Sequence, residues 1–94
     1  MALLAIDVGN TQTVFGLFEG GELRDHWRVA TERNRSGDEL GALYASFLDL
    51  STVEGIALSS TVPQLHRSYE DFAKEYAKVE LLDIGPGEIG RAHV

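Results

Sequence analysis

The chain has 94 residues, which is enough for one small domain. Because it contains no cysteine, it has neither disulfide bridges nor thiolate metal sites. Its 15 acidic and 8 basic side chains leave a net charge of −7, which repels the phosphate backbone and argues against sequence-independent binding to nucleic acid. The longest apolar run, residues 1–6, is far shorter than the ~20 residues that a membrane span needs, and it lacks the flanks of a signal peptide. We therefore expect a cytoplasmic protein with no nucleic-acid or membrane partner.

The first part of the chain has the pattern of three consecutive strands. Residues 3–8 form an apolar run that is too short for a helix and ends at Gly9. Residues 12–18 are rich in β-branched and aromatic side chains and are followed by Gly20-Gly21, a hairpin signal. Residues 22–30 then alternate between polar and apolar side chains. This pattern predicts an antiparallel meander.

The third predicted strand, residues 22–30, has an irregular apolar side. Simple alternation places Leu23, Trp27 and Val29 on one side of the strand. Asp25 interrupts that side, which indicates an edge strand or a bulge.

Two helices and two further strands follow. Residues 36–39 match a capping box, and a core-facing stripe follows them at helical spacing: Leu40, Leu43, Tyr44, Phe47 and Leu48. Residues 51–54 repeat the capping pattern, but strand-like residues come next, so we expect no helix there. We predict a buried strand at 55–60, a helix at 63–76 opened by a proline, and a strand at 79–84.

The predicted order β-β-β-α-β-α-β defines an α/β fold. An antiparallel meander followed by helix-crossover strands gives a mixed sheet with helices packed on it. The chain ends at the exit of its last predicted strand, where open α/β sheets place ligand-binding loops and where a further helix would follow. We therefore expect the sheet domain to be incomplete.

The segment between the first two strands, residues 7–14, has the composition of an anion-binding turn. A carboxylate at the end of a buried strand is costly unless it meets a cation or hydrogen-bond donors, and Asp7 is in that position. Gly9 would let phosphate oxygens approach the backbone, and Asn10 tolerates a positive φ. Backbone N–H groups and the side chains of Asn10, Thr11 and Thr13 could then face one concavity, while Asp7 holds a metal-bound water. These are the parts of a phosphoryl-transfer site.

A plainer interpretation is a hairpin turn whose Asp and Asn side chains cap their own backbone. The pattern Asp-x-Gly-x-Thr also occurs by chance. A buried strand before it and a hairpin strand directly after it favour the nucleotide site.

Other polar side chains carry weaker signals. Neither His26 nor His66 has a partner at metal-ligand spacing, so we interpret both as solvated or interface residues. Arg28, Arg33 and Arg35 form a local basic cluster in an acidic chain. They could meet phosphate or a partner's carboxylates, or form a solvated strand end and loop.

Four blocks of sequence together resemble those of one protein family. From Leu3 to Gly87 the chain is similar to the amino-terminal part of type III pantothenate kinases, which belong to the actin/hexokinase/Hsp70-like ATPase superfamily. The blocks are residues 7–16, residues 26–28 with 31–40, residues 59–63 and residues 85–87.

The resemblance implies a ribonuclease H-like mixed sheet, the first domain of an actin-like ATPase fold. It also implies transfer of the γ-phosphoryl of ATP to pantothenate, the first step of coenzyme A synthesis, by a cytoplasmic homodimer. Mg²⁺ and a monovalent cation, K⁺ or NH₄⁺, would be required. The implied ATP-binding residues, with Asp7 nearest the metal, are Asp7, Val8, Gly9, Asn10, Thr11, Gln12, Thr13 and Val14.

Two functional parts of the family have no counterpart in the 94 residues. These are a Gly-x-Asp-Arg block, whose aspartate is the general base, and a later aspartate that binds the monovalent cation. We therefore expect residues 1–87 to be a truncated nucleotide-binding domain, inactive alone. A non-catalytic accessory relative, or another small-molecule kinase of the superfamily, remains the alternative.

The tail, residues 88–94, departs from the family pattern. It reads Glu-Ile-Gly-Arg-Ala-His-Val, whereas the family continues with a Lys-Thr-Gly-type segment. Because its last six residues match a translated sequencing adapter, we interpret this tail as an artefact.

Overall fold

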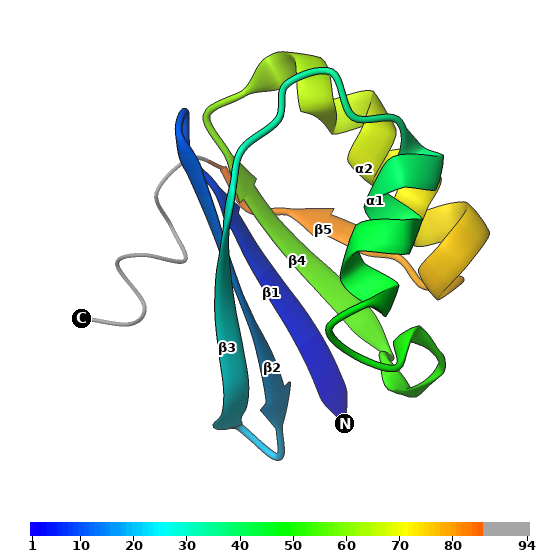
Figure 1. Ribbon diagram of the computed structural model, residues 1–94. Helices are drawn as coiled ribbons and strands as arrows, with labels where there is room; N and C mark the ends of the chain where they lie inside the picture. Colours follow the sequence, from blue (N-terminus) through cyan, green and yellow to red (C-terminus); the bar gives the residue numbers. More distant parts are fainter. Residues whose placement is uncertain (86–94) are drawn as a thin grey trace.

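The computed structural model describes residues 1–85, in which five strands form one sheet (Figure 1). The strands are β1 (Ala2–Val8), β2 (Gln12–Glu19), β3 (Glu22–Ala30), β4 (Gly55–Ser60) and β5 (Leu81–Asp83). Their order across the sheet is β3-β2-β1-β4-β5. The pairs β1–β2 and β2–β3 are antiparallel, and β1–β4 and β4–β5 are parallel. The predicted mixed sheet is confirmed.

The helices lie together on one face of this sheet (Figure 1). They are α1 (Gly37–Ala45), the 3₁₀ turns η1 (Leu50–Thr52) and η2 (Pro63–Leu65), α2 (His66–Phe72), and a π-helical turn, η3 (Ala73–Ala77), that continues α2. The capping box predicted for α1 is present, because the Ser36 hydroxyl accepts the Glu39 N–H and the Glu39 carboxylate accepts the Ser36 N–H. The predicted order β-β-β-α-β-α-β is therefore confirmed.

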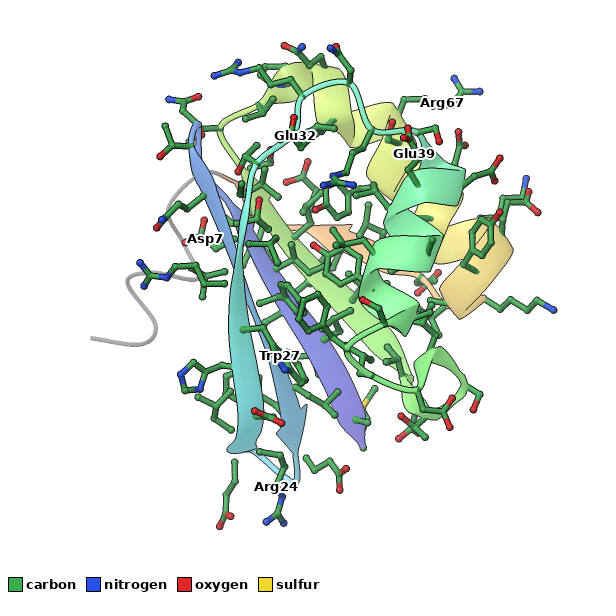
Figure 2. The ribbon with its side chains drawn as sticks, in the orientation of Figure 1. Asp7, Arg24, Trp27, Glu32, Glu39 and Arg67 are labelled. Atoms are coloured by element: carbon green, nitrogen blue, oxygen red, sulfur yellow. The ribbon has the colours of Figure 1, made fainter. Side chains whose placement is uncertain are left out.

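The core lies between the sheet and the helices. Because side chains alternate along a strand, Leu4, Ile6 and Val8 of β1 point toward the helices and are fully buried. Tyr44 of α1 and Tyr69 of α2 complete the core from the other side, and their hydroxyl oxygens lie 2.7 Å apart. The same alternation turns Asp7 to the opposite face, as Figure 2 shows.

A bulge in β3 makes one sequence prediction wrong. Leu17 pairs with Asp25, but its neighbour Phe18 pairs with Leu23, so Arg24 is an extra residue in the strand. The predicted bulge is therefore present. Because the extra residue reverses the alternation, Leu23 and Trp27 lie on opposite faces rather than on the same one.

Two helical segments also differ from expectation. The predicted single helix at 63–76 consists of a 3₁₀ turn, α2 and a π-helical turn, which widens the last turn and leaves Tyr76 42% exposed. No helix was expected near residues 51–54, yet η1 forms one turn there. Its N-cap is Asp49, whose carboxylate accepts the Ser51 N–H, so the capping signal lies two residues earlier than the pattern suggested.

No helix within residues 1–85 combines the length and apolar character needed to cross a membrane. The predicted atypical tail, 88–94, lies outside the described residues.

Candidate functional site

The turn between β1 and β2, residues 9–12, is closed by its own backbone. The Gly9 N–H donates to the Gln12 carbonyl oxygen at 2.9 Å. A Cβ at Gly9 would lie only 2.9 Å from that same oxygen, so the turn itself requires glycine. The turn therefore explains the glycine at position 9 without the expected need for room for a phosphate oxygen. The Gly9 N–H already donates a hydrogen bond inside the turn.

The tip of the turn is exposed and presents hydrogen-bond donors. Asn10, Thr11 and Gln12 are all exposed. No hydrogen bond among residues 1–85 occupies the backbone N–H of Asn10 or Thr11. The tolerance of Asn10 for a positive φ is not used, because Lys78 is the only non-glycine residue in the described part with that conformation. The Gly9–Gln12 bond closes the turn without a left-handed residue.

Thr31, which directly follows β3, donates hydrogen bonds to two carbonyl groups of the turn. Its backbone N–H donates to the Thr11 carbonyl at 2.9 Å, and its hydroxyl donates to the Gly9 carbonyl at 2.8 Å. The hydroxyls of Thr13 and Thr31 lie 2.8 Å apart, so Thr13 is the donor in that pair. Thr13 is buried rather than facing a common concavity with Thr11, which corrects the expected arrangement. Thr31 thus engages carbonyl oxygens of the turn and leaves the N–H groups of Asn10 and Thr11 without a hydrogen bond in the described part.

The ends of β1 and β4 meet beside the turn, since both strands run in the same direction (Figure 1). Thr61, which follows β4, donates its backbone N–H to the Val8 carbonyl at 3.0 Å and its hydroxyl to the same oxygen at 3.3 Å. The fold therefore brings three of the blocks that resemble the kinase family, residues 7–16, 31–40 and 59–63, to one end of the sheet.

Asp7 lies just before this turn, half-buried on the face opposite the helices. By strand register it is flanked by Val14 of β2 and Ser59 of β4. In the described part of the chain no cluster of three or more His, Cys, Asp or Glu side chains could hold a metal ion. A single carboxylate suits Mg²⁺ shared with substrate phosphates and water, because Mg²⁺ keeps several of its waters. The residues present therefore fit such a magnesium ion and do not form a metal site by themselves.

The predicted basic cluster divides between two places. Arg28 Nη1 donates to Gln12 Oε1 at 2.9 Å, and Arg33 Nη2 donates to Asn10 Oδ1 at 3.2 Å. Two of the three arginines therefore contact the turn directly.

Arg35, in the loop between β3 and α1, lies instead near the buried pair of Tyr44 and Tyr69. Its Nε is buried without a hydrogen-bond partner among residues 1–85. Burial raises the pKa of Tyr44 well above its usual value and raises the pKa of Tyr69 to about 12, and the Arg35 charge opposes both shifts. Arg35 therefore lies next to the core, and no side-chain hydrogen bond of the described part joins it to the turn.

The two histidines of the described residues do not belong to the turn. His66 Nε2 lies 3.1 Å from Asp83 Oδ2, which links α2 to β5 on the helix-covered face, and His26 is exposed on β3. His26 is thus solvated, as interpreted, whereas His66 contacts a carboxylate that sequence spacing does not reveal.

The architecture defines the class of fold. RuvC from Thermus thermophilus, in complex with a Holliday junction substrate, superposes with a TM-score of 0.64 at 18% identity, covering 98% of this chain and 69% of that one. Lmo2764 of Listeria monocytogenes, proposed to be an N-acetylmannosamine kinase, gives 0.63 at 18% identity, covering 90% of this chain and 35% of that one. YeaZ from Pseudomonas aeruginosa gives 0.58 at 16% identity, covering 89% and 43%. At these identities the likeness shows the fold alone, which is of the ribonuclease H-like and actin/hexokinase-like type.

Sequence comparison narrows this class to one family. The family model described as type III pantothenate kinase matches residues 3–90. Curated type III pantothenate kinases from Brevibacillus brevis, Anaeromyxobacter sp. and Myxococcus xanthus are 44%, 47% and 46% identical over 90 residues. The chain belongs to the type III pantothenate kinase family. The match covers 90% of this chain and 35% of each relative, so the chain spans about a third of their length.

Proposed function

We propose that this chain is the ATP-binding amino-terminal part of an enzyme that phosphorylates pantothenate, the first step of coenzyme A synthesis. The observation that carries the proposal is the turn that follows Asp7, with an exposed tip whose Asn10 and Thr11 N–H groups make no hydrogen bond within residues 1–85, in a chain of this family. In a chain with a net charge of −7, backbone donors of this kind offer a polyphosphate a place to bind.

The residues have separate tasks in this proposal. The N–H groups of Asn10 and Thr11 donate to phosphate oxygens, and the rest of residues 7–14 fixes their position. Asp7 would hold Mg²⁺ through water. Mg²⁺, when bound, neutralises charge on the phosphates.

The remaining tasks fall to residues outside these 94. They supply the general base, the pantothenate site and the site for K⁺ or NH₄⁺, and the full-length enzyme works as a cytoplasmic homodimer. The 94-residue chain binds ATP and does not turn over.

The substitution Asp7→Asn in the full-length enzyme tests this assignment. It keeps the size of the side chain and removes the charge that would hold Mg²⁺, so we expect kcat/KM with MgATP and pantothenate to fall by about 100-fold or more. Circular dichroism should show an unchanged fold, because Asp7 has no role in the core. Asp25→Asn, an equal charge change at an exposed position of β3, is the matched control and should keep its activity.

Near-normal activity of the Asp7→Asn enzyme would remove Asp7 from the proposed mechanism. A full-length protein that binds MgATP but does not phosphorylate pantothenate, as followed by ³¹P NMR, would favour the accessory relative. Transfer to a different small molecule in the same assay would favour another kinase of the superfamily.

A further inference from the structure

The side chains at the tip of the turn are oriented by two arginines. A side-chain amide has an acceptor oxygen at one end and two N–H donors at the other. In Gln12 and Asn10 the oxygen end accepts from Arg28 at 2.9 Å and from Arg33 at 3.2 Å. Because a guanidinium has only donors, each contact fixes the orientation of the amide and turns its NH₂ group away from the arginine.

These two arginines also differ from the arginines that form ion pairs. Among residues 1–85, the arginines that pair with carboxylates are Arg24, 3.8 Å from Glu22, and Arg67, 3.4 Å from Asp71. Arg28 and Arg33 contact neutral amides instead, and neither forms an ion pair with a carboxylate of residues 1–85. In a chain with a net charge of −7, two guanidinium groups that contact amides rather than carboxylates therefore lie at the turn.

The contacts come from two segments that are separate from the turn. Arg28 reaches Gln12 diagonally across the β2–β3 pair, and Arg33 reaches Asn10 from the loop that Thr31 ties to the same turn. A merely solvated strand end and loop does not explain why two arginines from separate segments each donate to an amide oxygen of the same turn.

We propose that Arg28 and Arg33 are positioning residues for the phosphates of the nucleotide. Each one holds an amide oxygen, so that the NH₂ groups of Gln12 and Asn10 donate to oxygens of the polyphosphate beside the backbone N–H groups. This inference rests on the proposed function, because it assumes that the turn binds the phosphates of ATP. It adds four donors and two positive charges to that site.

The affinity of the 94-residue chain for MgATP and for inorganic tripolyphosphate, measured by isothermal titration calorimetry, tests the proposal. Arg28→Gln and Arg33→Gln should each weaken both affinities by about 3- to 10-fold. Arg24→Gln is the matched control, because it removes the same charge from the far end of β3 (Figure 2) and should change affinity less than twofold. The difference should persist in 0.5 M salt, where the long-range effect of a lost charge is screened.

Side-chain NMR separates positioning from a structural role. In the wild-type chain, tripolyphosphate should shift the NH₂ resonances of both Asn10 and Gln12. The Gln12 shift should disappear in Arg28→Gln, and the Asn10 shift should disappear in Arg33→Gln, while the backbone spectrum remains that of a folded chain. A merely structural arginine would leave these shifts in place.

Two results would overturn the inference in different ways. If the wild-type chain binds MgATP and both variants bind it equally well, the arginines have no positioning role and the proposed function stands. If the wild-type chain binds neither MgATP nor tripolyphosphate, both the inference and the proposed function are wrong.

Discussion

Removing the hydroxyl of Tyr44 should destabilise the fold through the partner that it leaves behind. The Tyr44 and Tyr69 hydroxyls lie 2.7 Å apart, and the two residues are 0% and 2% exposed. In Tyr44→Phe the packing of the ring is kept, but the Tyr69 hydroxyl loses its described partner on a side chain that is almost fully buried. The phenylalanine variant therefore isolates the hydrogen bond from the aromatic contacts.

The expected magnitude follows from burial. A buried polar group that loses its hydrogen-bond partner costs about 1–3 kcal/mol, whereas replacing both partners by apolar groups of the same shape is close to neutral. Tyr44→Phe and Tyr69→Phe should each lower the free energy of unfolding by about 1–2 kcal/mol. For a domain of this size that corresponds to a fall in Tm of about 4–8 °C per kcal/mol. The double variant should be no less stable than either single variant.

Urea unfolding followed by circular dichroism, on the wild type and the three variants, completes a double-mutant cycle. Tyr76→Phe is the matched control, since it removes a hydroxyl that bonds Asp38 on an exposed side chain, and it should change stability little. Single variants as stable as the wild type, or a double variant whose loss equals the sum of the single losses, would refute the reasoning.

The remaining predictions concern pH, the turn and the first helix. Burial raises the pKa of Tyr69 to about 12, whereas a tyrosine in the unfolded chain loses its proton near pH ~10. The contribution of Tyr69 to the free energy of unfolding should therefore be constant below pH ~10 and should fall as pH rises toward 12. Thermal melts across that range should show the fall in the wild type and a smaller one in the double phenylalanine variant; a flat Tm would contradict it. Gly9→Ala should lower the free energy of unfolding by about 1–3 kcal/mol and weaken MgATP binding, because its Cβ would press on the Gln12 carbonyl. The control Gly55→Ala meets only an ordinary contact at 3.5 Å and should be tolerated. Equal effects of the two substitutions in urea unfolding and calorimetry would count against the turn geometry. Ser36→Ala should cost about 1 kcal/mol in urea unfolding, since it removes the N-cap of α1, and an unchanged midpoint would show that the cap contributes nothing.

Much of the fold follows from local patterns, because the strands and the first helix each have one face in the core. The strand at residues 55–60 was predicted with its observed bounds, and the capping box at Ser36 marked the start of α1. The bulge at Arg24 could be suspected from Asp25, but alternation alone placed Leu23 on the wrong face, since an extra residue reverses the pattern. The π-helical turn after α2 depends on tertiary packing and has no sequence signal of its own.

The sequence indicates which turn to consider as a candidate site but not the contacts that hold that turn. The sequence marked residues 7–14 because a strand, a glycine and polar side chains follow one another there. It did not show that Thr31 holds the turn, because that contact joins residues 22 positions apart through a single hydroxyl. The sequence shows these arginines only as a local cluster of charge. Their separation into two that meet the turn and one near the buried tyrosine pair depends on the path of the chain after β3.

The central claim is that the turn at residues 9–12 binds the phosphates of ATP. The most direct test is a titration of the ¹⁵N-labelled chain with MgATP, followed by backbone amide NMR. We predict saturable shifts that are largest at Asn10 and Thr11, with smaller ones at Asp7 and Thr31. Shifts that leave residues 7–14 unchanged, or no binding at millimolar MgATP, would contradict the claim.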